Sequence, residues 1–210
     1  MKTVLVRLGL VLPCLFAGLP ACAATLDVSV TDAAGRPVPS AVVTFAPVSG
    51  GAAQGRGGSY VMAQKDIKFV PYVLAVPVGA TVDFPNQDRV NHHVYSFSPV
   101  QRFQFPLYGP GKKRSLRFDH PGTVALACNI HDSMSAYIRI VDQPYFATTD
   151  DKGRASLDLP ADAGTLAVWQ PQLDAPDHSV SRKFTMSAGA AQQTFSVRLR
   201  AEALPSGGAY

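Results

Sequence analysis

Short stretches that alternate apolar and polar residues, each ended by proline, glycine or asparagine, limit how this chain can fold more than any other feature. In residues 26–32, for example, Leu26, Val28 and Val30 alternate with polar neighbours. No stretch of useful length has a helical period, and 17 glycines and 17 prolines interrupt the chain of 210 residues. The pattern predicts an all-β protein built as a sandwich or a barrel.

The predicted strands divide the chain into a middle part and two flanking parts. Residues 24–48 and 144–201 resemble the two halves of the carboxypeptidase regulatory-like fold, a small Ig-like β-sandwich. This resemblance implies one flanking domain into which residues 60–142 are inserted, after a glycine-rich linker at 49–59. The alternative is an N-terminal strand pair added to the middle domain. Residues 202–210 are predicted to be a tail.

The first residues have the features of a secretory signal. Lys2 and Arg7 precede an apolar run from Leu8 to Leu19, and small residues follow, which predicts cleavage after Ala23. The apolar run is shorter than the ~20 residues of a membrane-spanning helix. We therefore expect residues 1–23 to be a signal peptide and the protein to be periplasmic. A lipoprotein acylated at Cys22 is the alternative, and only then is a membrane partner expected.

Cleavage after Ala23 removes Cys14 and Cys22, so Cys128 becomes the only cysteine of an exported chain. Cysteines of exported proteins normally pair, so Cys128 is either a buried inert thiol or a metal thiolate. Loss of Lys2 and Arg7 also lowers the formal net charge from +4 to +2. This charge is too small to indicate a nucleic-acid partner.

The stretch ACNIHDSMSAY, residues 127–137, sets Cys128, His131 and Met134 at equal three-residue steps. A thiolate, an imidazole and a thioether together favour copper, and a blue-copper plane needs one more histidine. The strand at 92–98 supplies it. His92 and His93 are both candidates, but strand alternation allows only one of them to face the metal.

The ligand loop, the glycine in VPVGATVDFPN and the lead RFDHPGTVALAC are similar to the cupredoxin (blue copper) family. Within it, the sequence most resembles amicyanin-like and plastocyanin-like proteins, and the short ligand loop resembles that of the amicyanins. The resemblance covers about residues 60–142 and implies a Greek-key β-sandwich. It also implies one copper ion held by His92, Cys128, His131 and Met134, with His93 at the family's asparagine position.

The same resemblance implies a periplasmic electron carrier and not an enzyme. Its expected partners are redox proteins, such as a c-type cytochrome or a periplasmic dehydrogenase of the kind used in methylamine utilization. The edge of His131 is the implied exit for electrons. A copper-delivery or sequestering protein is the alternative, since it uses the same ligands. A copper enzyme such as a nitrite reductase needs a second histidine cluster, which the sequence lacks.

Two other kinds of site compete with copper, and several other residues have weaker patterns. Zinc competes for the site, but structural zinc sites use paired cysteines and do not use methionine. A cysteine hydrolase lacks an oriented third partner. Asn129 is expected to stiffen the ligand loop. We expect His120 and His178 to be solvated, and Trp169 to lie in a sandwich core.

Overall fold

The computed structural model describes residues 24–51, 60–131, 133–187 and 189–200. These residues form β-strands and one short 3-10 helix, η1 (Pro176–His178), with no α-helix among them. The predicted all-β class is confirmed. Within this part of the chain, no helix is long and apolar enough to cross a membrane. The predicted signal peptide with Cys22, most of the linker and the tail lie outside the described residues.

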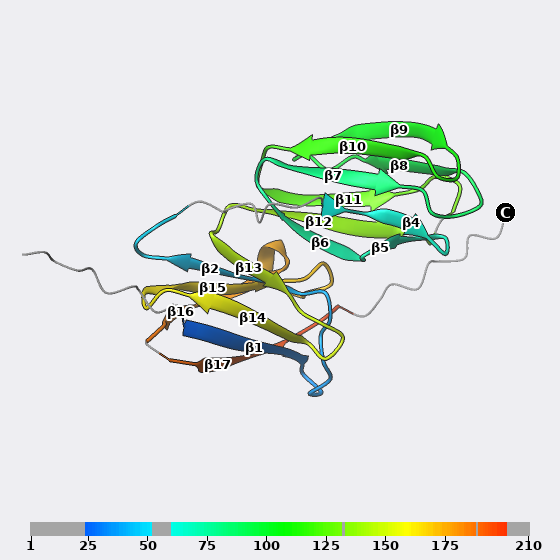
Figure 1. Cartoon of the computed structure of the whole chain (residues 1–210). Helices are drawn as coiled ribbons and strands as arrows, with labels where there is room; N and C mark the ends of the chain where they lie inside the picture. Colours follow the sequence, from blue (N-terminus) through cyan, green and yellow to red (C-terminus); the bar gives the residue numbers. More distant parts are fainter. Residues whose placement is uncertain (1–23, 52–59, 132, 188, 201–210) are drawn as a thin grey trace, which may run out of the picture.

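The middle of the chain, residues 60–141, forms two facing sheets and is called the middle unit (Figure 1). One sheet has the order β6-β12-β11-β8-β9 and the other β10-β7-β3, while β4 and β5 form a separate hairpin. The strands are β3 (Tyr60–Val61), β4 (Ala63–Lys65), β5 (Lys68–Val70), β6 (Val73–Pro77), β7 (Ala80–Pro85), β8 (His92–Ser96), β9 (Phe103–Tyr108), β10 (Lys113–Phe118), β11 (Gly122–Ala127) and β12 (Ser135–Val141).

Alternation along these strands fills the core of the middle unit. Val82 and Phe84 of β7 and Ile138 of β12 are almost fully buried in one apolar cluster. Side chains two residues apart on a strand point to the same face, so these residues all face the space between the sheets. In β8 the same rule turns His92 and Val94 inward, and both have no exposed surface.

The remaining strands form a second sandwich, called the flanking unit (Figure 1). Its sheets have the orders β14-β1-β17 and β13-β2-β15-β16, and its core includes Phe45, Leu157 and Leu166. The strands are β1 (Ala24–Asp32), β2 (Val42–Pro47), β13 (Tyr145–Thr148), β14 (Arg154–Leu159), β15 (Ala163–Trp169), β16 (Ser179–Thr185) and β17 (Ala191–Val197).

Both N-terminal strands pair with strands that follow residue 144. β1 is antiparallel to β14 and parallel to β17, and β2 lies between β13 and β15. Along the chain, the middle unit therefore lies between the two pieces that together form the flanking unit. That these pieces form an independent domain of the regulatory-like type stays a prediction.

The two units meet at a small apolar cluster. Val73 and Val141 come from the middle unit, and Val42 and Trp169 from the flanking unit. Trp169 is buried, as predicted, but it packs between the units rather than inside one sandwich. The guanidinium of Arg139 lies 5.2 Å from the centre of its indole ring.

Candidate metal centre

The loop that carries three of the predicted ligands is a closed connection between neighbouring strands. Cys128 directly follows β11, and Met134 directly precedes β12, with Ala127 paired to Ser135. The Cys128 N–H donates to the Met134 carbonyl at 3.2 Å. The Met134 N–H in turn donates to the His131 carbonyl at 2.9 Å. These two bonds close the loop and hold its backbone at one end of the sandwich.

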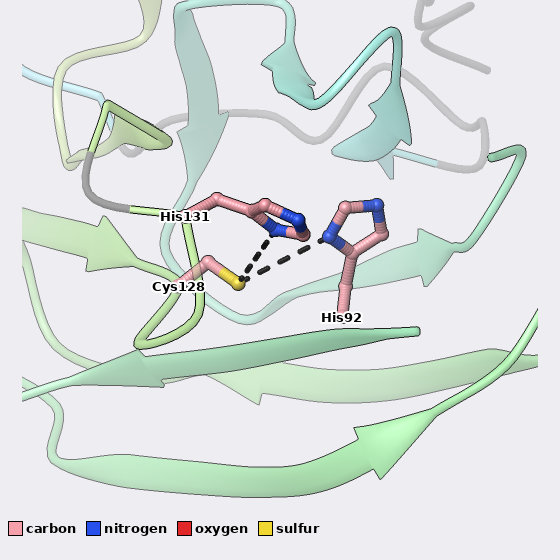
Figure 2. Close-up of side chains that lie close together, drawn as sticks. All are labelled: His92, Cys128 and His131. Atoms are coloured by element: carbon pink, nitrogen blue, oxygen red, sulfur yellow. Dashed lines mark hydrogen bonds between the residues drawn. The ribbon is translucent and has the colours of Figure 1, made fainter. Parts of the chain in front are cut away.

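Three of the four predicted ligands converge there. The Cys128 Sγ lies 3.7 Å from His131 Nδ1 and 4.0 Å from His92 Nδ1 (Figure 2). All three ligand atoms lie within 4.8 Å of one another. Nitrogen and sulfur bind a first-row metal ion at about 2.0–2.3 Å, which separates neighbouring ligand atoms by about 3.3–4 Å. The two sulfur–nitrogen distances therefore fit a single metal ion.

The surroundings of these atoms are apolar on one side and accessible on the other. His92 has no exposed surface, and Cys128 is 4% exposed, whereas His131 is half-buried. Met134 is 1% exposed and belongs with Cys128 to the core cluster of the middle unit. Burial of Met134 at the end of the loop agrees with a position close to the site. Its role as an axial ligand stays a prediction.

The orientation of His92 is fixed by a carboxylate. His92 Nε2 lies 2.7 Å from Asp88 Oδ2, and a carboxylate accepts hydrogen bonds, so we place the imidazole proton on Nε2. The lone pair of Nδ1 then faces the Cys128 sulfur. A carboxylate behind a histidine ligand is a common arrangement that sets its tautomer and ring orientation.

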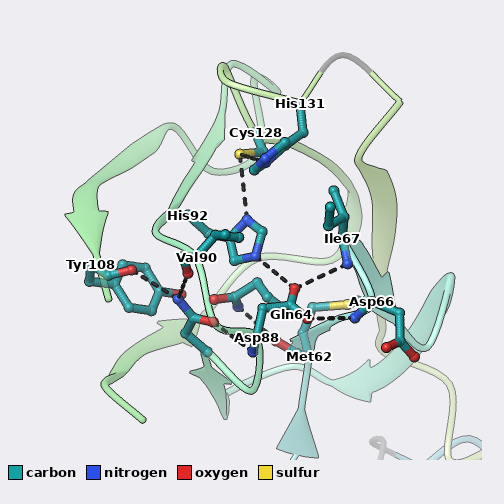
Figure 3. Close-up of polar contacts among 11 residues, drawn as sticks. Met62, Gln64, Asp66, Ile67, Asp88, Val90, His92, Tyr108, Cys128 and His131 are labelled. Atoms are coloured by element: carbon teal, nitrogen blue, oxygen red, sulfur yellow. Dashed lines mark hydrogen bonds and ion pairs between the residues drawn. The ribbon is translucent and has the colours of Figure 1, made fainter. Parts of the chain in front are cut away.

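Asp88 is itself held by the β4–β5 hairpin. Its carboxylate accepts the N–H of Asp66 at 2.6 Å and the N–H of Ile67 at 3.1 Å (Figure 3). Burial raises the pKa of Asp88, but the hydrogen bonds from His92, Ile67 and Asp66 outweigh it and hold the pKa below its ordinary value of 3.8. The carboxylate is therefore ionised at neutral pH and available to His92.

The hairpin presents these two amides through a strained turn. Asp66 and Ile67 have φ of 53° and 54°, in the left-handed region. Two successive left-handed residues are typical of a tight two-residue hairpin, where asparagine and glycine are usual. An isoleucine in this conformation is unusual, because its branched side chain crowds the backbone. The strained turn thus lies where its two backbone amides donate to the Asp88 carboxylate.

Asn86 holds the chain between β7 and β8 in place. Its Nδ2 donates to the carbonyls of Val90 at 2.8 Å and Tyr108 at 3.0 Å, and its Oδ1 accepts the N–H of Asp88 at 2.9 Å. Asn86 is 1% exposed. The Tyr108 hydroxyl donates to the Phe84 carbonyl at 3.0 Å, which anchors the neighbouring strand. The bonds of Asn86 thus link Asp88, Val90 and Tyr108, which lie near His92 (Figure 3).

Sequence reasoning missed Asp88 and Asn86. The available signal was the stretch PNQDRVNH, in which a carboxylate precedes the candidate histidine by four residues. The contact of Asp88 with the hairpin had no sequence signal, because the two segments are joined only by the fold.

His93 lies on the opposite face of β8 from His92. It is 5% exposed, its ring packs 5.1 Å from that of Tyr95, and its Nδ1 has no hydrogen-bond partner in the described part of the chain. Among the described residues, the cluster of possible metal ligands contains His92 and not His93. The assignment of the four ligands, and of His93 to the family's asparagine position, stays a prediction.

The other polar residues of the sequence analysis lie away from the ligand atoms or at the surface. Asn129 is exposed, and no hydrogen bond of its side chain is found in the described structure, so its stiffening role stays a prediction. His120 is exposed as expected. His178 is half-buried, and its Nδ1 lies 3.1 Å from the Leu173 carbonyl, so it is only partly exposed to solvent.

Comparison with protein families finds no match to this chain, and comparison with curated proteins finds none either. Comparison with solved structures does. The matching structures include cupredoxins and a copper-containing nitrite reductase.

Three of these structures illustrate the sequence identity and the coverage of the matches. The Cu(I) form of a single-residue mutant of amicyanin is 22% identical, with a TM-score of 0.38, over 47% of this chain and 98% of that chain. A purple cupredoxin from Nitrosopumilus maritimus is 21% identical, with a TM-score of 0.35, over 40% of this chain and 99% of that one. A copper-containing nitrite reductase from Thermus scotoductus SA-01 is 28% identical, with a TM-score of 0.39, over 45% of this chain and 25% of that one.

Proposed function

We propose that this chain is a periplasmic type 1 copper protein that transfers single electrons between redox partners. The observation that carries the proposal is the convergence of Cys128 Sγ, His92 Nδ1 and His131 Nδ1 within 4.8 Å at one end of the middle unit. A thiolate and two imidazoles form the trigonal ligand plane of blue-copper sites, and Met134 completes the set from the end of the same loop.

The donor set favours copper over its competitors. Soft thiolate and thioether ligands select copper, whereas structural zinc sites use four nitrogen or sulfur ligands that do not include methionine. Bound copper supplies one-electron chemistry by alternating between Cu(I) and Cu(II). The residues of the chain determine how easily that change takes place.

Rigidity is the property that the chain contributes. His92 is buried and held by Asp88, Asp88 is held by two backbone amides, and the ligand loop is closed by the bond from Cys128 to Met134. Because His92 and the backbone of the ligand loop are restrained without the metal, we expect the ligand positions to change little between oxidation states. A small rearrangement favours fast electron transfer.

The accessible edge of the site suits a weakly bound protein partner. His131 is the least buried of the three converging ligands. Three loops that meet at this end each expose one large apolar side chain: Ile67 is 44% exposed, Val90 43% and Ile130 48%. We propose that a redox protein, such as a c-type cytochrome or a periplasmic dehydrogenase, docks against these side chains and exchanges electrons through His131.

A catalytic role is not part of the proposal. A copper enzyme of the nitrite reductase type needs a second metal with further histidines. In the described part of the chain, His92, Cys128 and His131 form the one group of three or more candidate ligands. The periplasmic location rests on the predicted signal peptide, and attachment to a membrane is proposed only for a form lipidated at Cys22.

The experiment that tests the proposal is an optical and EPR spectrum of the copper-loaded mature protein beside a Cys128→Ala variant. A thiolate site gives an intense visible absorption band and narrow copper hyperfine splitting, and both disappear in the variant. An ordinary cupric spectrum that is unchanged in Cys128→Ala overturns the proposal, because the sulfur is then not a ligand.

A second measurement separates electron transfer from copper delivery, which uses the same ligands. A reversible reduction potential and rapid exchange with a c-type cytochrome support an electron carrier. Rapid loss of Cu(I) to a chelator, without a reversible potential, supports delivery.

A further inference from the structure

A groove of about 760 Å³ lies at the junction of the two units. We call it the junction groove. Thr123 and Arg139 line it from the middle unit, and the flanking unit contributes Trp169, Asp177, His178 and Arg200. Thr123 lies at the start of β11, and Cys128 directly follows the end of that strand, so the two are about 17 Å apart. The groove is therefore separate from the candidate metal centre.

Arg139 is the unusual residue of this groove. Its guanidinium lies 5.2 Å from the centre of the Trp169 ring, and its Nη1 donates to Thr123 Oγ1 at 2.9 Å. Its Nε is buried and has no hydrogen-bond partner in the described part of the chain. None of the ion pairs between described residues includes Arg139. A buried donor without a partner is rare and calls for an explanation.

The charge of Arg139 is only partly balanced. Burial lowers the pKa of the guanidinium, and the more distant carboxylates of Asp142 and Asp177 oppose this effect. Arg200 adds a second cation to the lining, and its nearest carboxylate, Asp174, is 3.5 Å away at an exposed position. The lining therefore has two arginines against one carboxylate, that of Asp177.

Two residues that the flanking unit contributes to the lining have a strained backbone. Asp177 and His178 have φ of 50° and 53°, both left-handed for residues with side chains. The His178 carbonyl accepts the N–H of Gln170 at 3.1 Å, and His178 Nδ1 lies 3.1 Å from the Leu173 carbonyl. Left-handed residues that are fixed by their surroundings are concentrated at ligand sites.

We propose that the junction groove binds a small oxyanion, a carboxylate or a phosphate group, with Arg139 as its anchor. The guanidinium presents donors in a planar fork that matches two oxygens of either group. Its stacking on Trp169 fixes the plane of the fork, and the bond to Thr123 uses one N–H of Nη1, which leaves the other amino N–H groups of this groove-lining residue as donors. An oxyanion bound by these amino groups balances the half-buried charge of Arg139.

Trp169 makes the proposal directly testable, because it is the only tryptophan in the chain. We would titrate the mature protein with sodium phosphate and, separately, with sodium citrate, and follow the tryptophan emission. Sodium chloride at matched ionic strength is the reference. We expect a saturable change that chloride does not produce. Tighter binding of phosphate indicates a tetrahedral ligand, and tighter binding of citrate indicates a carboxylate.

Variants of Arg139 identify the anchor. Arg139→Gln removes the charge and is expected to weaken oxyanion binding about tenfold or more. Arg139→Lys keeps the charge but loses the planar fork, so its affinity should lie between those of Arg139→Gln and the unchanged protein. Arg102→Gln, at an exposed arginine outside the groove, is the matched control and is expected to bind as the unchanged protein does.

Two results would overturn the proposal. One is the absence of any saturable change with phosphate or citrate beyond that with chloride. The other is equal affinity in Arg139→Gln and the unchanged protein. A far-UV circular dichroism spectrum shows whether Arg139→Gln is folded. If it is not, Arg200→Gln serves instead, because Arg200 lies in the same lining, and a decrease in affinity is expected there too.

Discussion

Asp88 accepts a hydrogen bond from His92 at 2.7 Å, on the side of the imidazole ring that faces away from Cys128. The bond joins the candidate metal centre to the β4–β5 hairpin, because Asp88 also accepts the amides of Asp66 and Ile67. The position of a buried ligand is thus set by a surface turn. This relationship makes Asp88 a positioning residue for the proposed copper site.

We expect Asp88→Ala to weaken copper binding about 10- to 100-fold, the range typical of lost hydrogen-bond partners behind metal ligands. The physical reason is that His92 loses both the group that fixes its tautomer and the charge that increases its basicity. Competition with a chelator of known affinity measures the change.

Asp119→Asn is the matched control for this experiment. Asp119 is 55% exposed and pairs with Arg117 at the surface, so its loss should leave copper affinity unchanged. Equal affinities of Asp88→Ala and Asp119→Asn would show that Asp88 does not position His92.

The strained β4–β5 hairpin predicts a substitution that stabilises the protein. Ile67 has φ of 54°, and its side chain is 44% exposed, so glycine removes strain and gives up little buried surface. We expect Ile67→Gly to raise the free energy of unfolding by about 1 kcal/mol. The visible spectrum of the copper form should not change, because the Ile67 amide to Asp88 remains.

Urea unfolding of the copper-free protein measures this difference, and Ile67→Ala is the control. Alanine keeps a Cβ in the left-handed conformation, so its gain should be smaller. A lower stability of Ile67→Gly than of Ile67→Ala would contradict the strain argument.

The sequence was sufficient to predict local features of the site and insufficient for the contacts between segments. Alternation indicated that Leu26, Val28 and Val30 share one face of a strand, and all three lie in the core of the flanking unit. The three-residue steps placed Cys128 and His131 on one loop. Both patterns act over a few residues. The bond from Ile67 to Asp88 spans 21 residues and depends on how the hairpin packs.

Two further features of the fold had no reliable local pattern. The turn at Asp66 and Ile67 lacks the glycine or asparagine that identifies a tight hairpin. Trp169 has the periodicity of a core residue, and the pattern does not distinguish a sandwich core from the surface between two units. His178 was expected in solvent because its neighbours in the sequence are polar; it is half-buried, and the contact of its ring with the Leu173 carbonyl had no sequence signal.

The turn after β1 predicts a pH dependence of stability. The Asp32 carboxylate accepts the N–H of Arg36 and the N–H of Ala34, both at 2.9 Å, and pairs with Arg36 Nε at 2.6 Å. The backbone bond from Arg36 has the largest effect, and although burial opposes it, the pKa of Asp32 lies below its ordinary value of 3.8. A lowered pKa in the folded state stabilises the fold above the unfolded-state pKa.

We therefore expect Asp32→Asn to lower the free energy of unfolding at neutral pH. The difference from the unchanged protein should shrink as the pH falls below about 3.8 and through the pKa of the folded state, because Asp32 then takes up a proton in both states. Urea unfolding at a series of pH values measures it. A difference that is constant across this range would contradict the assignment to Asp32.

Met134 provides a test of the axial position. The residue is 1% exposed, and its backbone makes the two hydrogen bonds that close the ligand loop. Its side chain takes part in neither bond. We expect Met134→Gln to bind copper with a shifted reduction potential, since a weak axial ligand tunes the potential more than the affinity. Cyclic voltammetry measures the shift. Complete loss of copper binding in this variant would count against an axial role.

The exposed apolar side chains around His131 test how a partner docks. Ile130 is 48% exposed on the ligand loop, next to His131, so a charge at this position lies within the proposed contact surface. We expect Ile130→Lys to lower the second-order rate of electron exchange with a c-type cytochrome about tenfold, the effect of a lost central apolar contact. The reduction potential should not change, because Ile130 is not a proposed ligand. Val48→Lys is the control, since Val48 is 77% exposed on the flanking unit. Stopped-flow mixing of reduced protein with oxidised cytochrome measures both variants, and equal rates would place the docking surface elsewhere.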